Sequence, residues 1–362
     1  MSRLPGSPSM KCFRFVLIGL LLCGLTGCGG GSSSSDGASN EAATSSVTGA
    51  AGADGDSDSS GAGAAASGAV AANGTIGFSV LTLKNPFFKI IADTLTAEAE
   101  KQGFSVLVND ANLDVDTQAK HLDNYLSQKV TAIVLNPADR IAIGPAIKKA
   151  NDAGIPVFTC DLQCVSEDAE IAGHVGTDNY AGGRQAGEAM AEVLGEEGGD
   201  VLVLHFKQAN SCVLRVNGFT DVVNATNEER TEGKINVVAE LNGGGLRDVG
   251  HNATADALVA YPNLRGIFAI NDPSALGARK ALEEAGKQDQ VRIIGFDGQI
   301  EGKQAIKNGE IYADPIQFPD QMAVLTMQNI QKYLDGEEFE KVNLITPKLY
   351  KKADADQDPD LK

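Results

Sequence analysis

Short apolar segments alternate with segments of helical period from residue 74 onward, and this alternation leaves few folds open to the chain. In the first series, strands are predicted at 76–81, 104–109, 132–136, 156–160 and 171–175. Amphipathic helices are predicted between them at 88–102, 116–128 and 141–151. Because helices separate the strands, we expect the strands to run parallel and the crossovers to be right-handed.

A second series of the same kind follows in the other half of the chain. Its predicted strands are 201–205, 235–241, 266–271 and 291–296. Its predicted helices are 179–194, 213–224, 253–260, 274–285 and 303–307. Two such series predict an α/β protein with two doubly wound parallel sheets, one in each of two lobes. Ligands of such sheets bind beyond the carboxyl ends of the strands.

The N-terminal segment has the features of an export signal. Three basic residues precede the apolar run 15–22, which is too short to span a membrane as a mature helix. The run leads to Leu25-Thr26-Gly27-Cys28, which resembles a bacterial lipobox. This resemblance implies cleavage after residue 27 and lipidation of Cys28; the alternative is an ordinary secretory signal cut nearby. In both cases we expect a protein of the bacterial cell envelope, on its periplasmic or extracytoplasmic face.

The segment 28–73 that follows is almost wholly Gly, Ala, Ser, Asp and Thr. Such a composition cannot bury a core, so we predict a flexible tether between Cys28 and the folded part. The full chain has 362 residues and a net charge of −18, with no visible basic patch. This charge argues against nucleic acid as a partner, and against any membrane contact apart from the lipid anchor.

Polar and aromatic residues follow the predicted strands in both halves of the chain. They are Asn85, Phe87 and Phe88 after the first strand, Asn136 and Asp161 after the third and fourth, and Asn271, Phe296 and Asp297 in the second half. Any one Asn or Asp at such a place is usually a helix cap or turn residue, and paired phenylalanines alone are more often core. Their recurrence at equivalent places favours a binding cleft. Amides, carboxylates and aromatic faces together suit a sugar, which has polar edges and C–H faces.

The motifs also resemble a known family. They are Asn85-Pro86-Phe87-Phe88, Asn136-Pro137, Asn271-Asp272, Gly295-Phe296-Asp297-Gly298 and Gln317-Phe318-Pro319-Asp320-Gln321. In this order and spacing they resemble the ribose-type periplasmic sugar-binding proteins of ABC importers. The resemblance implies the type I periplasmic binding protein fold, with two lobes that close on a ligand around a three-strand hinge. Lobe one would be 74–177 and 318–345, lobe two 178–317 and 346–352, and 353–362 a flexible tail.

The resemblance further implies which residues bind the ligand. Asn85, Phe87, Phe88, Asn136 and Asp161 would face it from lobe one, and Arg215, Asn271, Phe296, Asp297 and the hinge residue Gln317 from lobe two. Three positions depart from the pattern of ribose binders. Leu162 stands where they have arginine, Leu81 where they have serine, and the loop 242–246 lacks their aromatic residue. These departures favour a ligand other than ribose, such as a deoxy sugar or a polyol.

Other function classes find little support in the sequence. No motif of a nucleophilic enzyme, phosphate-binding loop or metal site is present, so we predict neither enzymatic activity nor a cofactor. Segment 110–121 starts like an EF-hand loop, but Val115 stands where that loop needs glycine. The predicted partners are a small sugar or polyol and an ABC permease, with the protein a monomer. The alternative is a sensory protein that presents its ligand to a chemoreceptor or sensor kinase.

Three cysteines would remain in the exported protein besides Cys28: Cys160, Cys164 and Cys212. An odd number leaves at least one thiol free or paired between chains. Bridges Cys160–Cys164 and Cys164–Cys212 are both open to the sequence, which does not choose between them.

Overall fold

The computed structural model describes residues 73–361, which belong to one compact unit. The predicted signal peptide, Cys28 and the tether up to residue 72 lie outside the described residues. Within the described part, every helix falls short of the length and apolar character that a membrane span requires.

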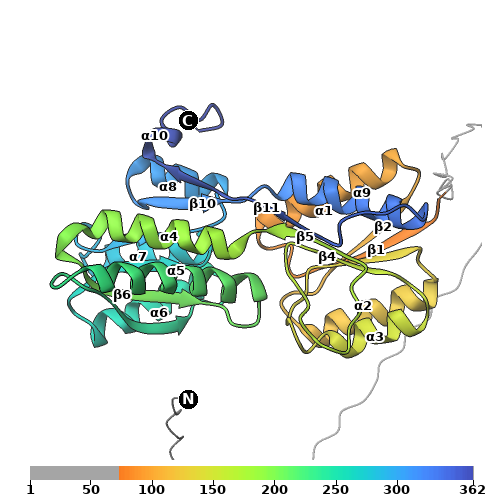
Figure 1. The fold of residues 1–362 in the computed structure, drawn as a ribbon, viewed down its shortest axis with the longest axis horizontal. Helices are drawn as coiled ribbons and strands as arrows, with labels where there is room; N and C mark the ends of the chain where they lie inside the picture. Colours follow the sequence, from red (N-terminus) through yellow and green to blue (C-terminus); the bar gives the residue numbers. More distant parts are fainter. Residues whose placement is uncertain (1–72, 362) are drawn as a thin grey trace, which may run out of the picture. The chain divides into compact units, whose positions relative to one another are not determined.

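Lobe one contains a six-stranded sheet in the order β11-β5-β4-β3-β1-β2 (Figure 1). Its strands are β1 (Thr75–Val80), β2 (Ser105–Asp110), β3 (Ala132–Leu135), β4 (Val157–Cys160), β5 (Gly173–Thr177) and β11 (Val342–Ile345). Helices α1 (Pro86–Lys101) and α9 (Pro319–Leu334) cover one face, and α2 (Val115–Gln128) and α3 (Gly144–Asp152) the other. All strand pairings in this sheet are parallel.

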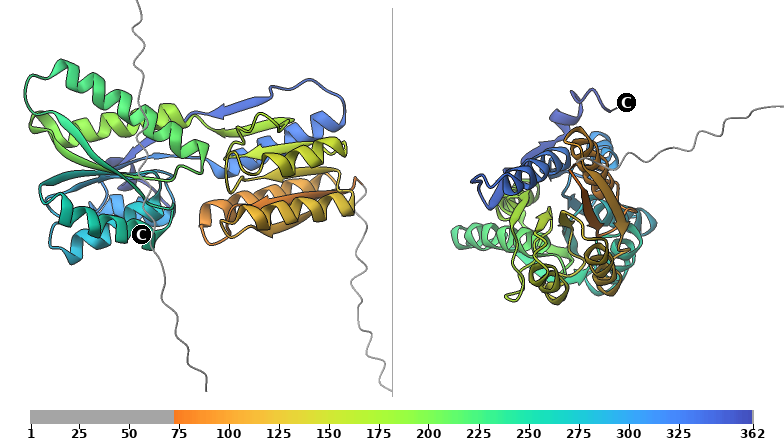
Figure 2. Two further views of the ribbon diagram at one scale, coloured as in Figure 1. Left: turned by 90° about the horizontal axis from the view of Figure 1, so that it is seen from below. Right: turned by 90° about the vertical axis from the view of Figure 1, so that its right-hand side faces the viewer.

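Lobe two contains the second sheet, in the order β12-β10-β9-β8-β6-β7. Its strands are β6 (Gly199–His205), β7 (Ile235–Asn242), β8 (Leu264–Ala269), β9 (Arg292–Ile294), β10 (Ala313–Ile316) and β12 (Lys348–Lys351). Its helices are α4 (Asn179–Leu194), α5 (Asn210–Glu229), α6 (Arg247–Ala260), α7 (Asp272–Glu284), α8 (Ile300–Asn308) and α10 (Lys352–Ala355), with the short 3-10 turn Gly195–Glu197. Each sheet thus lies between helical layers (Figure 2).

The chain passes between the two sheets three times: after β5, after β10 and after β11. The first two crossings lead into helices, α4 and α9. The third joins β11 directly to β12 without a helix, and β12 pairs antiparallel with β10. The predicted fold class, two doubly wound parallel-sheet lobes joined by three strands, is confirmed.

Residues of a single strand alternate between the two helical layers, which builds a core on each face of the sheet. In lobe one, Val134 packs toward α1 and α9, whereas its neighbour Ile133 packs toward α2 and α3. A glycine decides one close contact in this packing. A Cβ at Gly77 would lie 2.6 Å from the ring of Tyr125, so only glycine lets this fully buried ring lie against β1.

The C-terminal segment 353–361 differs from the predicted flexible tail. It forms α10 and a turn that pack on α8, where Leu361 is 8% exposed. Lys303 on α8 forms an ion pair with Asp358 at 3.1 Å, and Tyr350 donates to the same carboxylate. The segment is mostly Asp and Ala, and this composition gave no sign of these contacts, because they depend on one leucine and one ion pair.

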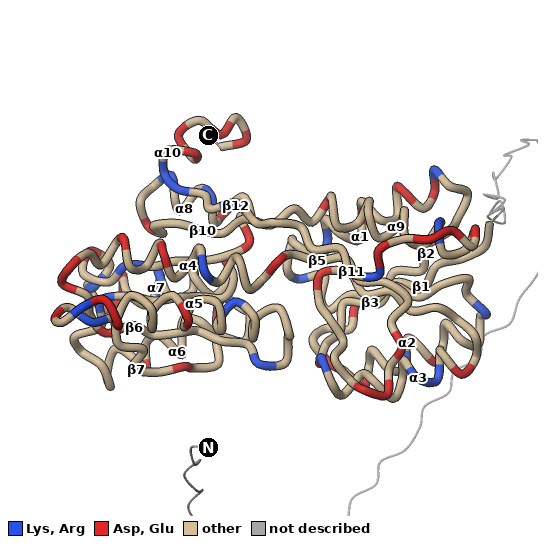
Figure 3. Tube along the Cα trace, in the orientation of Figure 1, with Lys and Arg blue, Asp and Glu red and all other residues tan. Residues whose placement is uncertain are grey.

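Charged residues of both signs are interspersed along the chain in both lobes (Figure 3). Pairs such as Lys89–Asp93 and Lys148–Asp152 lie one turn apart on exposed helix faces. Such exposed pairs are screened by solvent and contribute little to stability, so they say little about function. The pair Arg215–Asp297 is different, because its side chains are only 4% and 5% exposed.

Candidate ligand-binding site

The carboxyl ends of the strands in both lobes border one cavity of about 50 Å³. Its lining combines buried polar groups with apolar side chains. The polar and charged residues are Thr82, Asn85, Asp161, Ser211, Arg215, Asn271, Asp297 and Gln317, and the larger apolar ones include Leu81, Phe87, Phe88, Leu113, Leu162, Phe206 and Leu246. Eight of the ten residues that the sequence analysis selected therefore line the same cavity. The lining has the composition of a ligand pocket, with mostly apolar walls and a few converging polar groups, whereas a volume of about 50 Å³ is too small for a sugar unless the lobes move apart.

Asn85 is placed by the start of α1. It is the N-cap of that helix, where its side-chain Oδ1 accepts from the amide of Phe87 at 3.0 Å, and Pro86 occupies the first helical position. Its Nδ2 group forms no hydrogen bond within the described residues and lines the cavity. Phe87 and Phe88 pack edge to face at 5.5 Å, so the cap presents one free amide donor beside two aromatic rings.

Asp161 directly follows β4 and has a φ of 62°, a left-handed conformation that is uncommon for a residue other than glycine. The residue is 4% exposed, and its Oδ1 atom is buried without a hydrogen-bond partner in the described part of the chain. Burial raises the pKa of this carboxyl to about 7; the charge of Arg215 lowers it, and that of Asp297 raises it. A buried, unpaired acceptor in a strained backbone position points to a ligand that supplies the missing donor.

Arg215 on α5 is held in place by three partners in lobe two. Its Nε donates to Oδ1 of Asn179 at 2.8 Å, and its Nη1 donates to the carbonyl of Ile270 at 2.6 Å and to Oδ1 of Asp297 at 3.2 Å. Its guanidinium lies 3.8 Å above the ring centre of Phe296. This packing prevents the guanidinium from following a mobile ligand and makes it a preorganised donor.

Asp297 follows β9 at a φ of 107° and accepts from both Arg215 and the hinge. Gln317 donates from Nε2 to Oδ1 of Asp297 at 2.6 Å, and its Oε1 accepts from Thr177 at 2.7 Å. Burial raises the pKa of Asp297, while Arg215 and the amides of Gln299 and Gln317 counteract that rise. The bond between Thr177 and Gln317 joins two of the three crossings, so the hinge and the site share one hydrogen-bond network.

Gln299 is a site residue that the sequence analysis did not select. Its Nε2 donates to Oδ1 of Asn85 in lobe one at 2.9 Å and to Oδ2 of Asp297 in lobe two at 3.3 Å. It therefore connects the two lobes through Asn85 and Asp297, which both line the cavity. One feature of the sequence could have indicated Gln299 as a site residue: it lies two residues after Asp297, in the turn that precedes α8.

Two selected residues lie behind the cavity instead of lining it. Asn136 is fully buried and donates to the carbonyl of Cys160 at 2.6 Å, which ties the end of β3 to the end of β4. Phe296 is also fully buried, with its ring beneath Arg215. Asn271, in contrast, lines the cavity. Its side chain also caps α7 and donates to the carbonyl of Gly245 at 3.0 Å.

The three positions that depart from ribose binders also border the cavity. Leu81, Leu162 and the loop residues Gly244, Gly245 and Leu246 all line it. Leucine and glycine side chains form no hydrogen bonds. These positions therefore give the ligand neither a hydroxyl, nor a guanidinium, nor an aromatic ring to contact. Cys212 lines the cavity as well, and all three cysteines among the described residues are free thiols.

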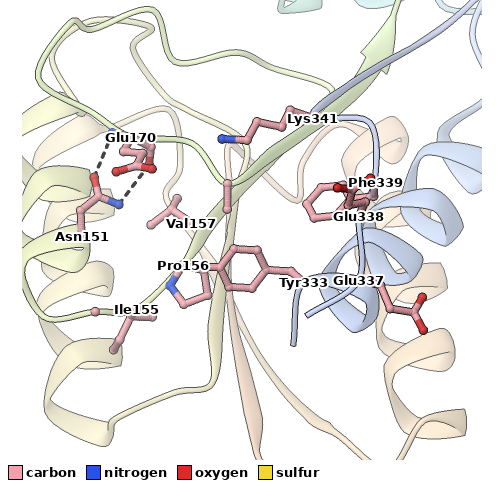
Figure 4. Close-up of a pocket in the computed structure, with 12 residues that line it drawn as sticks. Asn151, Ile155, Pro156, Val157, Glu170, Tyr333, Glu337, Glu338, Phe339 and Lys341 are labelled. Atoms are coloured by element: carbon pink, nitrogen blue, oxygen red, sulfur yellow. Dashed lines mark hydrogen bonds between the residues drawn. The ribbon is translucent and has the colours of Figure 1, made fainter. Parts of the chain in front are cut away.

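A second depression of about 450 Å³ lies at the opposite ends of the lobe-one strands, near the start of β4 (Figure 4). Tyr333 and Phe339 form its apolar side, and Glu337 and Glu338 stand at its rim. The side chain of Asn151 exchanges two hydrogen bonds with the backbone of Glu170. Its polar groups are thus exposed or already paired, so the cavity between the lobes is the better candidate site.

Comparisons with known proteins agree with this geometry. A family model described as a periplasmic binding protein domain matches residues 76–338. The chain is 35% identical over 279 residues to the ribose import binding protein RbsB of Escherichia coli, covering 76% of this chain and 90% of the relative. It is 30% identical over 265 residues to a D-apiose import binding protein of Actinobacillus succinogenes, covering 73% and 83%.

Among solved structures, an ABC transporter solute-binding protein of Agrobacterium vitis with bound D-fucose superposes with a TM-score of 0.72 at 31% identity, covering 78% of this chain and 97% of that one. The family consists of solute-binding proteins, which confirms the prediction that the chain is not an enzyme. The chain belongs to the periplasmic binding protein family, as a ribose-type sugar-binding protein of the type I fold.

Proposed function

We propose that this protein captures a compact sugar or sugar-like solute between its lobes and delivers it to an ABC import permease. The observation that carries the proposal is that Asn85 and Asp161 line the same cavity as Phe87 and Phe88, and that each keeps a polar atom without a partner in the described residues: Nδ2 of Asn85 and the buried Oδ1 of Asp161. A sugar hydroxyl both donates and accepts, so it satisfies an amide donor and a carboxylate acceptor together. Relatives named for ribose and D-apiose import, and one with bound D-fucose, support a sugar ligand.

The proposed ligand contacts follow the lining of the cavity. Asn85, Phe87, Phe88, Asp161, Arg215, Asn271, Asp297 and Gln317 would touch the ligand. Asn136 and Phe296 would act from behind, by holding the end of β4 and the guanidinium of Arg215 in place. A buried polar group left without a partner costs about 1–3 kcal/mol, so an analogue that lacks one contacted hydroxyl is rejected.

Ligand capture by this fold requires two states, open and closed, whose balance the ligand shifts. The structure contains direct bonds between the lobes besides that of Gln299. Asn210 donates to Oε1 of Gln163 at 2.9 Å, and the amide of Arg140 donates to the carbonyl of Gln208 at 2.9 Å. These bonds are made only when the lobes are together, so they add to the ligand's own contacts in favouring closure.

Titration calorimetry of the purified protein against pentoses, hexoses, deoxy sugars and polyols tests the proposed function. We expect at least one compound to bind with a Kd of about 10 μM or lower and to be recovered chemically unchanged. Absence of binding across the whole panel, or chemical conversion of a sugar, would contradict sugar capture. Uptake of the labelled ligand by cells that lack the protein tests delivery to a permease, and we expect uptake to fall.

Replacing Gln299 by alanine is expected to raise the Kd of the ligand by about 3- to 10-fold, because closure loses one net hydrogen bond. Small-angle scattering of the unliganded variant should also show a larger radius of gyration, since fewer bonds hold the lobes together. Gln290→Ala, at an exposed turn of the same lobe, is the matched control. An unchanged Kd and radius in Gln299→Ala would show that Gln299 does not stabilise the closed state.

We further propose that the protein is a lipid-anchored monomer. The lipobox-like sequence before Cys28 supports the anchor. Mass spectrometry of the mature N-terminus should show a lipid adduct on Cys28, and Cys28→Ser should move the protein from the membrane fraction to the soluble fraction. An unmodified N-terminus in the wild type would refute the anchor.

A further inference from the structure

The charges inside the cavity do not balance. Its charged residues are Asp161, Arg215 and Asp297. Arg215 and Asp297 form an ion pair at 3.2 Å, and the remaining bonds of Arg215 go to Asn179 and to the carbonyl of Ile270. The carboxylate of Asp161 is therefore left as the one negative charge of the lining without a cation bound to it.

Within residues 73–361, the elements around Asp161 supply no other cation. Asp297, from the loop after β9, adds a second negative charge to its surroundings, and Arg215 from α5 is the one described cation that shifts its pKa. His174 on β5 is kept neutral, because burial lowers its pKa to about 4. The thiols of Cys160 and Cys212 also stay neutral, because burial raises their pKa values to about 12 and about 11. Leu162, next in the chain, is apolar.

We propose that the ligand is a compact sugar that carries a protonated amino group, and that this group binds on Asp161. The inference rests on the proposed function, since it names the class of solute that the same cavity takes. A buried carboxylate needs both hydrogen-bond donors and a compensating charge, and an ammonium group supplies both, with three donors in one small group. A neutral hydroxyl would fill the hydrogen-bonding position of Oδ1 but leave the buried charge uncompensated.

The remaining cavity groups fit the rest of such a ligand. The free Nδ2 of Asn85 donates to a ring or hydroxyl oxygen, and the rings of Phe87 and Phe88 cover a C–H face. Leu81 and Leu162 also line the cavity, and their apolar side chains cannot form hydrogen bonds. The edge of the ligand that faces them should therefore lack hydroxyl groups. Burial raises the pKa of Asp161 to about 7, which is the expected behaviour of a carboxyl group whose cation comes with the ligand.

Calorimetry with matched sets of compounds tests this proposal. Each set contains an aminodeoxy pentose or hexose, its N-acetyl derivative and its parent sugar, with the amine at different ring positions between sets. We expect at least one amine to bind about 10- to 100-fold more tightly than both of its neutral counterparts. The N-acetyl compound separates charge from bulk, because it keeps the nitrogen substituent and removes the charge.

Binding of the amine should also be linked to protons. Because the bound ammonium lowers the pKa of Asp161, the carboxyl should release a proton on binding near pH 6. Affinity for the amine should then rise about tenfold between pH 5.5 and pH 7. Titrations in two buffers of different ionisation enthalpy measure the released proton directly.

Asp161→Asn keeps the shape of the side chain and removes its charge. In this variant we expect the preference for the amine over the parent sugar to fall from tenfold or more to about one, with the proton release lost. Asp256→Asn, exposed on α6, is the matched control and should keep both. Equal or tighter binding of the neutral sugars by the wild type would overturn this proposal while leaving sugar capture intact. Failure of every sugar, neutral or cationic, would overturn the proposed function itself.

Discussion

Arg215→Met is expected to abolish ligand binding and to lower the free energy of unfolding by about 3–5 kcal/mol. The variant keeps the length of the side chain but leaves Asp297, which is 5% exposed, as a buried carboxylate without its cation. It also removes the guanidinium that lies 3.8 Å above Phe296. Urea denaturation measures the stability, and calorimetry with the identified ligand measures the binding.

Two further variants separate stability from binding. Arg184→Met removes an exposed arginine on α4, paired with Glu188 at 4.0 Å, and should change stability by no more than about 0.5 kcal/mol. The double variant Arg215→Met/Asp297→Asn removes both charges and keeps a side chain that tolerates the positive φ of this position, so it should recover most of the lost stability while still failing to bind. Full binding by Arg215→Met would show that the guanidinium does not belong to the site.

Asp314→Asn is expected to stabilise the protein at pH 8 by about 2–3 kcal/mol relative to the wild type, with little change at pH 4.5. Asp314 on β10 and Asp272 at the start of α7 are 0% and 1% exposed. Both oxygens of Asp314 and Oδ1 of Asp272 lack a hydrogen-bond donor within the described residues, whereas Oδ2 of Asp272 accepts from the amide of Gln299 at 2.6 Å. Two buried carboxyl groups side by side can be satisfied by one shared proton.

The sign of the pH dependence follows from the raised pKa values. Burial raises the pKa of Asp314 to about 6, and burial together with the neighbouring Asp314 raises that of Asp272 well above its usual range. A carboxyl with a raised folded-state pKa binds its proton more tightly in the folded state. Its contribution to stability is therefore complete below the unfolded pKa of about 4 and is lost as the pH rises through the folded value.

The asparagine variant replaces the shared proton by an amide that donates at every pH. Melting temperatures measured from pH 4.5 to 8.5 should consequently fall with pH in the wild type and fall less steeply in Asp314→Asn, which keeps the other buried carboxyls with raised pKa values, Asp161 and Asp297. Asp256→Asn, exposed on α6, should follow the wild-type curve. A parallel fall in Asp314→Asn would mean that the pair does not share a proton.

In the C-terminal hinge region, the sequence pattern does not predict the strands. Strands β10, β11 and β12 are each four residues long, too short for a period of two to stand out from chance. The predicted helix near 303–307 is α8 (Ile300–Asn308), whereas the predicted start of α5 at residue 213 lies three residues late. Such boundaries depend on the caps and on tertiary contacts more than on the apolar period.

The sequence by itself determined the two-sheet architecture and one edge of the site. Apolar strands alternating with amphipathic helices can bury their faces only as layered parallel sheets, and this places Asn85, Asp161 and Asp297 at strand ends. Only the tertiary structure decided which side chains reach the cavity. Gln299 bridges the lobes, Phe296 lies beneath Arg215, and Asp161 remains unpaired, because these outcomes depend on contacts between residues from distant parts of the chain. The apolar periodicity of a strand or helix shows which of its side chains are buried. It does not show which residue of another element each side chain will contact, so it carries no information about such contacts.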